Sequence, residues 1–235
     1  MDAFQTFGKL VHVQRLSDKW QLTNVLIAVL GANLDAELNN GAHMSNSGIG
    51  DVMFSNFIGR WWKNRLIHTC FGVAVKFPVG EYDKNEPLNI GENRYVLYLP
   101  GFFFEFRYPL EKGMIFIDNA IGLNWRLENP DTDYDDHDVF VFNLILTYFT
   151  SKDCKLGFFV QPDCEVALNK SEWKGANQHD GDFYTFGTGL GVVWNIKPGT
   201  NVNLKWTREW YGRDLNNGAF APEINAVHFM WTYTF

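Results

Sequence analysis

Two residues near position 45 have the types and the spacing that hydrolytic chemistry could use. His43 and Ser45 are two residues apart, so on a β-strand their side chains would share one face and the imidazole could take the proton of the hydroxyl. The flanking residues, Asn39-Asn40-Gly41 and Ser47-Gly48, are instead those of a polar loop. We therefore expect an ordinary loop here and no catalytic residue, with a hydrolase that uses His43 and Ser45 as the alternative.

A run of five aspartates is the second feature with chemical potential. Calcium prefers oxygen ligands, so such a run could hold it. The EF-hand pattern fails, however, because Asp136 stands where glycine is needed and Phe142 where glutamate is needed. We favour a solvated acidic loop and expect neither a metal site nor a cofactor. The aspartates are Asp131, Asp133, Asp135, Asp136 and Asp138.

The composition of the 235-residue chain excludes several classes of protein. Aromatic residues make up 17% of it, yet the mean hydropathy is only −0.20, which is typical of strands that alternate apolar and polar positions. The net charge of −7 argues against a nucleic-acid partner. The longest apolar run, 25–30, is far shorter than the roughly 20 residues of a membrane-spanning helix. Three cysteines are too few and too scattered for a disulfide framework.

The elements that must position these residues show a period of two. In the segment 225–235 every second residue from Asn225 onward is mostly apolar or aromatic, and the residues between them are small or polar. Side chains alternate across a strand, so this pattern predicts a strand with one greasy and one polar face. The pattern recurs along the chain, and we expect eleven strands: 4–15, 19–32, 49–62, 66–78, 94–108, 114–127, 138–150, 154–166, 182–196, 201–211 and 224–235.

The connections decide between a soluble sandwich and a membrane barrel. Tight turns rich in Gly, Pro, Asp, Asn, Ser and Lys alternate with long connections at 33–48, 79–93, 128–137, 167–181 and 212–222. Outer-membrane barrels have short periplasmic turns and long outer loops, and their strands are longer than the five or six residues usual in soluble proteins. The fold class predicted is therefore all-β, an antiparallel transmembrane β-barrel in which the long connections share one end.

The odd number of strands predicts an incomplete barrel. Single-chain barrels normally have an even number of strands with both ends in the periplasm, so we expect about twelve strands when complete and one strand before Phe4 that is missing here. An export signal is expected and also absent. The chain 1–235 is then a single outer-membrane β-barrel domain, N-terminally truncated, and we expect a gap or a strained parallel contact beside the strand 224–235.

The polar faces of the strands carry the candidate site residues. In a barrel these side chains point into the lumen, where they would select permeants. The alternative is a static network of ion pairs that plugs a narrow lumen, because buried charges are costly unless paired. The candidates that line the lumen are His68, Lys76, Glu105, Arg107, Asp118, Asn124, Arg126, Gln161, Lys205, Glu209 and His228.

Several segments resemble one family, the outer-membrane phenol meta-pathway degradation proteins. The matching pieces are SGIGD at 47–51, FPVGEYD at 77–83, NIGENR at 89–94 and ENPDTDY at 128–134. The resemblance runs from about residue 8 to the end, and it implies a transporter barrel that takes up hydrophobic, often aromatic, small molecules. It assigns no catalytic residue. The terminal Phe235 resembles the signal that bacterial barrels present to their assembly machinery.

These observations lead to one expected function and two alternatives. We expect an outer-membrane channel of a Gram-negative bacterium for passive uptake of small hydrophobic or aromatic compounds, and not an enzyme. Its partners would be membrane lipid and lipopolysaccharide, the assembly machinery and the permeant. The alternatives are a lipid hydrolase based on His43 and Ser45, and a structural barrel with a plugged lumen.

Overall fold

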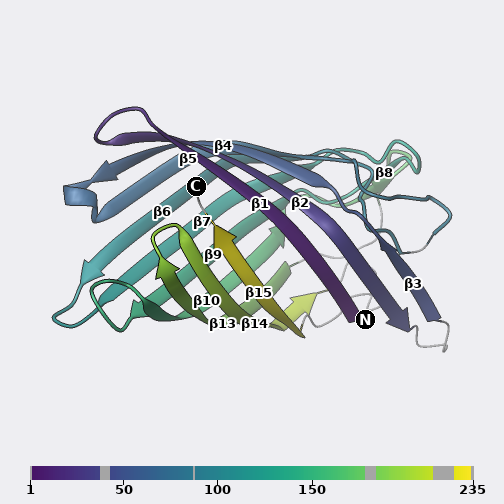
Figure 1. Cartoon of the computed structure of the whole chain (residues 1–235). Coiled ribbons are helices and arrows are strands. Elements are labelled where there is room, and N and C mark those ends of the chain that lie inside the picture. The colour runs from purple at the N-terminus through teal and green to yellow at the C-terminus, as the bar shows by residue number, and fades with distance from the viewer. Residues whose placement is uncertain (1, 38–42, 87, 178–183, 214–224, 234–235) are drawn as a thin grey trace.

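One curved antiparallel sheet dominates the molecule (Figure 1). The structure, a computed structural model, describes residues 2–37, 43–86, 88–177, 184–213 and 225–233. Eleven long strands follow one another across the sheet in chain order, as the sequence predicts. They are β1 (Asp2–Arg15), β2 (Trp20–Glu37), β4 (Val52–Trp62), β5 (Ile67–Phe77), β6 (Val96–Pro109), β7 (Met114–Arg126), β9 (Val139–Phe149), β10 (Leu156–Ala167), β13 (Tyr184–Lys197), β14 (Thr200–Arg213) and β15 (Asn225–Tyr233).

Several short elements lie in the connections between the long strands. β3 (His43–Gly48) pairs with the end of β2, and a three-stranded sheet joins β8 (Tyr134–Asp135), β11 (Glu172–Trp173) and β12 (Ala176–Asn177). A single 3-10 turn, η1 (Lys63–Arg65), links β4 to β5. Within the described ranges, no helix is long and apolar enough to span a membrane.

The segment 33–48 differs from its prediction as a loop. β2 continues to Glu37, and β3 returns along it with Asp35 opposite Ser45. The polar residues there satisfy their backbone groups by extending the hairpin ladder, which composition alone does not reveal.

The long connections gather at one end of the sheet. The connection after β5 contacts the one after β2, through the bond from Asn46 Nδ2 to the carbonyl oxygen of Leu88 at 2.7 Å. It also contacts the connection after β7, through Asn93 and Asn129. Trp173, in the connection after β10, donates to the carbonyl oxygen of Thr132 at 2.9 Å. Four of the five long connections thus share one end, as predicted, and most of the fifth, 214–222, lies outside the described residues.

The register separates two faces. Phe71, Phe102 and Ile121 lie in one cross-strand row, and Phe71 and Phe102 are exposed, as are Leu190 and Leu204 on other strands. The opposite face holds buried small residues such as Ser55 and Ala74. The apolar and polar side chains of these strands therefore lie on opposite faces of the sheet, as their alternation in the sequence predicts.

Glycines identify the polar face as the concave one. Phe57 on β4 meets Phe103 on β6 with ring centroids 4.8 Å apart, across Gly72 of the intervening β5. Lys205 on β14 likewise reaches Gln161 on β10 across Gly189 of β13. Side chains from strands two apart can meet only where the sheet curls toward them and the strand between lacks a bulky side chain.

The sheet has two free edges in the part of the chain that is described. β1 pairs with β2 alone and β15 with β14 alone, and no ladder joins β1 to β15. A gap beside β15 is what the strand count predicts. The expected additional strand before β1 stays a prediction.

Candidate functional site

All eleven predicted lumen residues lie on the concave face. The cross-strand register runs from Lys76 through Val96 to Arg126 and, further along, from His68 through Glu105 to Asp118. The same face carries Asn124 on β7, Gln161 on β10, Lys205 and Glu209 on β14, and His228 on β15. Alternation along each strand is sufficient to predict this facing. Their role in selecting a permeant stays a prediction.

A cluster of charges and rings occupies the concave face near the short turns. Arg107 pairs with Glu105, and its guanidinium lies over the rings of Trp61 at 4.6 Å and Phe116 at 4.9 Å. His68 stacks on Trp61 with 4.2 Å between centroids. The cation is therefore held between a carboxylate and two aromatic faces, an arrangement that satisfies its charge without water. Asp118 lies next in the row from Glu105.

The middle of the concave face is more apolar. Phe57 and Phe103 form an edge-to-face pair there. A second pair, Phe116 and Phe149 with centroids 5.0 Å apart, lies nearer the short turns, at the start of β7 and the end of β9. Phe103 remains 39% exposed, so part of its ring is available to a molecule inside the barrel.

The opposite wall carries polar groups that contact one another. Lys205 Nζ donates to Gln161 Oε1 at 3.4 Å, and Thr207 Oγ1 contacts His228 Nε2 at 2.8 Å. Asp163 faces the same side, opposite Asn143 and Gly187. Asp163 is not among the predicted lumen residues, although the period of two along β10 places it on the same face as Gln161.

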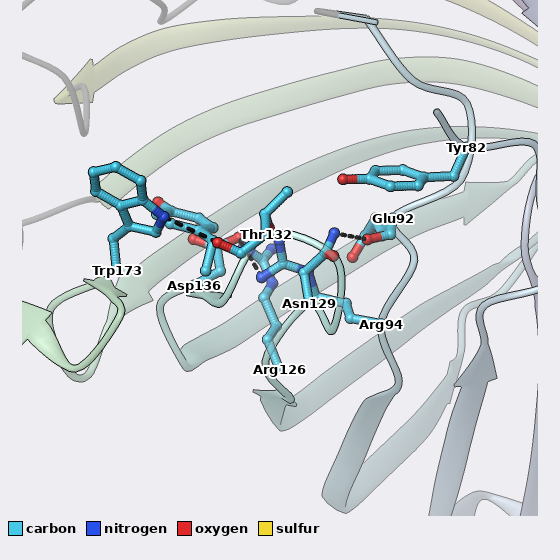
Figure 2. Close-up of a pocket in the computed structure, with 9 residues that line it drawn as sticks. Tyr82, Glu92, Arg94, Arg126, Asn129, Thr132, Asp136 and Trp173 are labelled. Carbon is cyan, nitrogen blue, oxygen red and sulfur yellow. Dashed lines mark hydrogen bonds and ion pairs between the residues drawn. The ribbon is translucent and has the colours of Figure 1, made fainter. Parts of the chain in front are cut away.

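A pocket of about 580 Å³ opens at the end that carries the long connections (Figure 2). Arg126, at the end of β7, donates to Asp136 Oδ2 at 2.7 Å. Asn129, which is only 3% exposed, fixes the floor by donating to the carbonyl oxygen of Glu92 and accepting from Asn93. The full lining is Tyr82, Glu92, Arg94, Arg126, Asn129, Thr132, Tyr134, Asp136 and Trp173.

The charges in this pocket are strongly coupled. Burial by itself would raise the pKa of the Asp136 carboxyl. Hydrogen bonds from His137 and the positive charges of Arg126 and Arg94 outweigh burial and hold that pKa well below its usual range. Asp136 is therefore an anion at neutral pH, and it anchors the loop to the end of β7.

Sequence reasoning missed most of this pocket. Of its nine lining residues only Arg126 was a candidate. Arg94 begins the predicted strand 94–108 but was not among the candidates, and the other seven lie in the predicted long connections, where no periodicity indicates direction. The motifs NIGENR and ENPDTDY contain Glu92, Arg94, Asn129 and Tyr134. These motifs indicated the family, but they did not indicate that the residues share a pocket.

The aspartate run is tied into the fold. Asp138 accepts hydrogen bonds from the backbone N–H of Arg126 and from Asn169, and Asp131 accepts one from Asn93. The described residues contain no group of three or more His, Cys, Asp or Glu side chains placed to hold a metal ion.

His43 and Ser45 share the exposed face of β3, contrary to the prediction of an irregular loop. His43 Nε2 contacts Asp35 Oδ1 at 2.7 Å, across the hairpin on β2. One imidazole nitrogen of His43 thus faces a carboxylate, and within the described residues no hydrogen bond joins His43 to the hydroxyl of Ser45.

Comparison with known proteins identifies the family. A family model described as "Putative MetA-pathway of phenol degradation" matches residues 1–221. The chain belongs to this family. No curated protein shows a significant match.

A solved structure supports the fold assignment for this member of the family. The crystal structure of an outer membrane channel from Pseudomonas putida F1 matches with a TM-score of 0.73 and 15% sequence identity. The match covers 98% of this chain and 82% of that channel. The fold is thus all-β, that of an antiparallel transmembrane barrel, and both the predicted fold class and the predicted family are confirmed.

Proposed function

We propose that this chain is an outer-membrane channel through which small hydrophobic, including aromatic, molecules pass without energy input. The observation that carries the proposal is the composition of the concave face. The aromatic pair Phe57–Phe103 occupies its middle level, and the pair Phe116–Phe149 lies nearer the short turns. Nearer the two ends, Arg107 is paired with Glu105 and Arg126 with Asp136.

This distribution suits an apolar permeant better than an ion. A conducting pore for ions presents rings of accessible charge, whereas paired charges next to exposed rings offer little to replace a hydration shell. An apolar molecule gains about 25 cal/mol for each Å² of surface it withdraws from water onto such rings. The family description, which names phenol degradation, and the barrel of the Pseudomonas putida outer membrane channel support a channel located in the outer membrane.

Uptake by whole cells tests the proposal. Gram-negative cells that express the barrel should take up radiolabelled toluene and phenol faster than cells with an empty vector, with no gain for a sugar of similar size. Gly189→Phe should reduce the gain, because its ring enters the concave side, where a Cβ at this position would already meet Lys205 at 3.0 Å. Leu190→Phe, one residue away on the exposed convex face, is the matched control and should have no effect.

Two results would reject this function. One is equal uptake of toluene with and without the barrel when the folded protein is present in the membrane. The other is an uptake that Gly189→Phe leaves unchanged, since a lumen route must respond to a ring placed in it.

A lipid hydrolase is the second candidate, and one contact favours it. Asp35 holds His43 on the strand face that also carries Ser45, and a carboxylate that orients a histidine is part of known hydrolytic triads. Against it, a catalytic base must reach the nucleophile within about 3.2 Å, and among the described residues no hydrogen bond joins His43 to Ser45, although the second ring nitrogen is not used by Asp35. We therefore propose that the barrel is not an enzyme.

A further inference from the structure

Arg94 is the least compensated charge in the loop-end pocket. Its side chain is only 10% exposed, and its Nε and Nη1 atoms are buried without a hydrogen-bond partner. The nearest carboxylate oxygen, Asp136 Oδ2, is 4.0 Å from Nη1. Its other contact is the ring of Tyr134, 5.5 Å from the guanidinium carbon. A buried guanidinium normally satisfies its donors, because an unpaired charged group is costly.

The neighbouring acids are already used by other cations. Lys76 pairs with Glu92, and Arg126 binds the same oxygen of Asp136 at the shorter distance of 2.7 Å. Asp135 and Glu165 also lie near Arg94 and Arg126, respectively. Within the described residues neither forms an ion pair with Arg94, so its Nε and Nη1 atoms stay without a hydrogen-bond partner. Arg94 lines the pocket, so an anion that enters it meets this charge.

Aromatic side chains border the same pocket. Figure 2 shows Tyr82 and Trp173 on opposite sides, with Arg94, Arg126 and Asn129 between them. The indole N–H of Trp173 donates a hydrogen bond to the carbonyl oxygen of Thr132, which holds the ring in place. The residue is 51% exposed, so part of its surface is available to a ligand. A volume of about 580 Å³ is within the range of small-molecule sites and ample for a single ring with a substituent.

We propose that this pocket is a binding site for small aromatic carboxylates, in which Arg94 binds the carboxylate and the rings of Tyr82, Tyr134 and Trp173 contact the apolar body. The guanidinium suits this role because its planar, forked donors match the two oxygens of a carboxylate. The inference rests on the proposed channel function, to which it adds a substrate class: acids would be captured at the outer mouth before they pass.

Binding in detergent micelles tests the site without transport. The probe is 4-fluorobenzoate, followed by fluorine NMR and by calorimetry with the full chain, and 4-fluorobenzyl alcohol reports partition into micelles. We expect saturable binding of the acid and none of the alcohol. Arg94→Gln should weaken binding about tenfold to a hundredfold, the usual effect of losing a charged hydrogen-bond pair. Arg94→Lys should fall between, because it keeps the charge but loses the fork.

Controls separate a local effect from a loss of charge or of fold. Arg65→Gln removes one positive charge from the exposed turn at the opposite end and should bind like the parent. Strand content and the shift of electrophoretic mobility on heating show whether Arg94→Gln is folded. If Arg94→Gln does not fold, binding of 4-fluorobenzoate is measured with Arg94→Lys and Trp173→Ala instead. Both variants should weaken this binding.

Two outcomes overturn the site: affinity for 4-fluorobenzoate unchanged in a folded Arg94 variant, or tighter binding of 4-fluorobenzylamine than of the acid. The second would mean that the aspartates of the loop, and not Arg94, dominate the field in the pocket. Failure of the channel function looks different, because 4-fluorobenzoate would then bind in micelles while cells show no gain in toluene uptake.

Discussion

The two faces of the sheet are built on the same strands and stabilised in different ways. The convex face leaves apolar side chains uncovered: Phe71 is 54% exposed, Leu204 52% and Phe229 70%. The concave face packs against itself, with Ser55 at 2% and Ala74 at 6% exposure. The convex face therefore depends on lipid, whereas the concave face depends on the close fit of one strand's side chains over the next.

One alternating pattern of residues thus produces two faces on which substitutions affect stability for different reasons. On the convex face the class of side chain matters and its shape matters little, because fluid lipid adapts to any apolar group. On the concave face the shape matters at each position, because a Cβ in the wrong place meets backbone. Substitutions on the two faces can test this contrast.

A charge on the convex face should be the most damaging change. Leu190→Arg, at an exposed mid-strand position of β13, should cost about 2–4 kcal/mol of unfolding free energy in lipid vesicles. Asn143→Arg, mid-strand on the concave face of β9, should cost less, because its charge would face the carboxylate of Asp163 on the neighbouring strand. Urea unfolding in vesicles measures both, and equal costs would mean that the two faces are assigned wrongly.

A single methyl group should distinguish two glycines. A Cβ on Gly72 would collide with the backbone oxygen of Asn56 and with Phe57, whereas a Cβ on Gly31 would meet nothing within 4 Å. Gly72→Ala should therefore cost about 1–3 kcal/mol through overpacking, and Gly31→Ala should be close to neutral. The same unfolding assay decides, and a neutral Gly72→Ala would show that the strands can separate at this point.

Acid should weaken the loop end through Asp136. Its pKa is depressed in the folded protein, so the carboxylate adds stability above the unfolded pKa of about 3.9, and this stability is lost as the pH falls through the lower folded value. Between pH 4 and more acidic conditions the parent should lose more stability than Asp136→Asn, which has no carboxylate to protonate. Parallel pH profiles for the two proteins would contradict this role of Asp136.

The smallest expected effect is that of Ser45→Ala. The exposed hydroxyl on β3 should contribute nothing measurable to stability or to toluene uptake, because His43 contacts Asp35 instead. A phospholipase and deacylase assay on the purified barrel checks this. Activity that disappears in both Ser45→Ala and His43→Ala would instead establish the hydrolase.

The sequence predicted the strands and their faces because the pleat is a local property. Side chains alternate along any strand, so the pattern in β5 or β15 indicates its two sides without knowledge of the neighbours. The turns are local too, as in the tight connections between β1 and β2 and between β13 and β14. Phe235, expected to address the assembly machinery, lies outside the described residues.

The sequence by itself therefore determined an antiparallel barrel, the order of its strands and which side chains line it. Only the tertiary structure decided what those side chains meet. Arg94, Arg126 and Trp173 lie on three different connections or strand ends, and they share one pocket because the register of the intervening strands brings those ends together. Whether Arg94 finds a carboxylate there depends on competition from Lys76 and Arg126. Periodicity along one strand cannot encode that competition, because the partners belong to segments far apart in the chain.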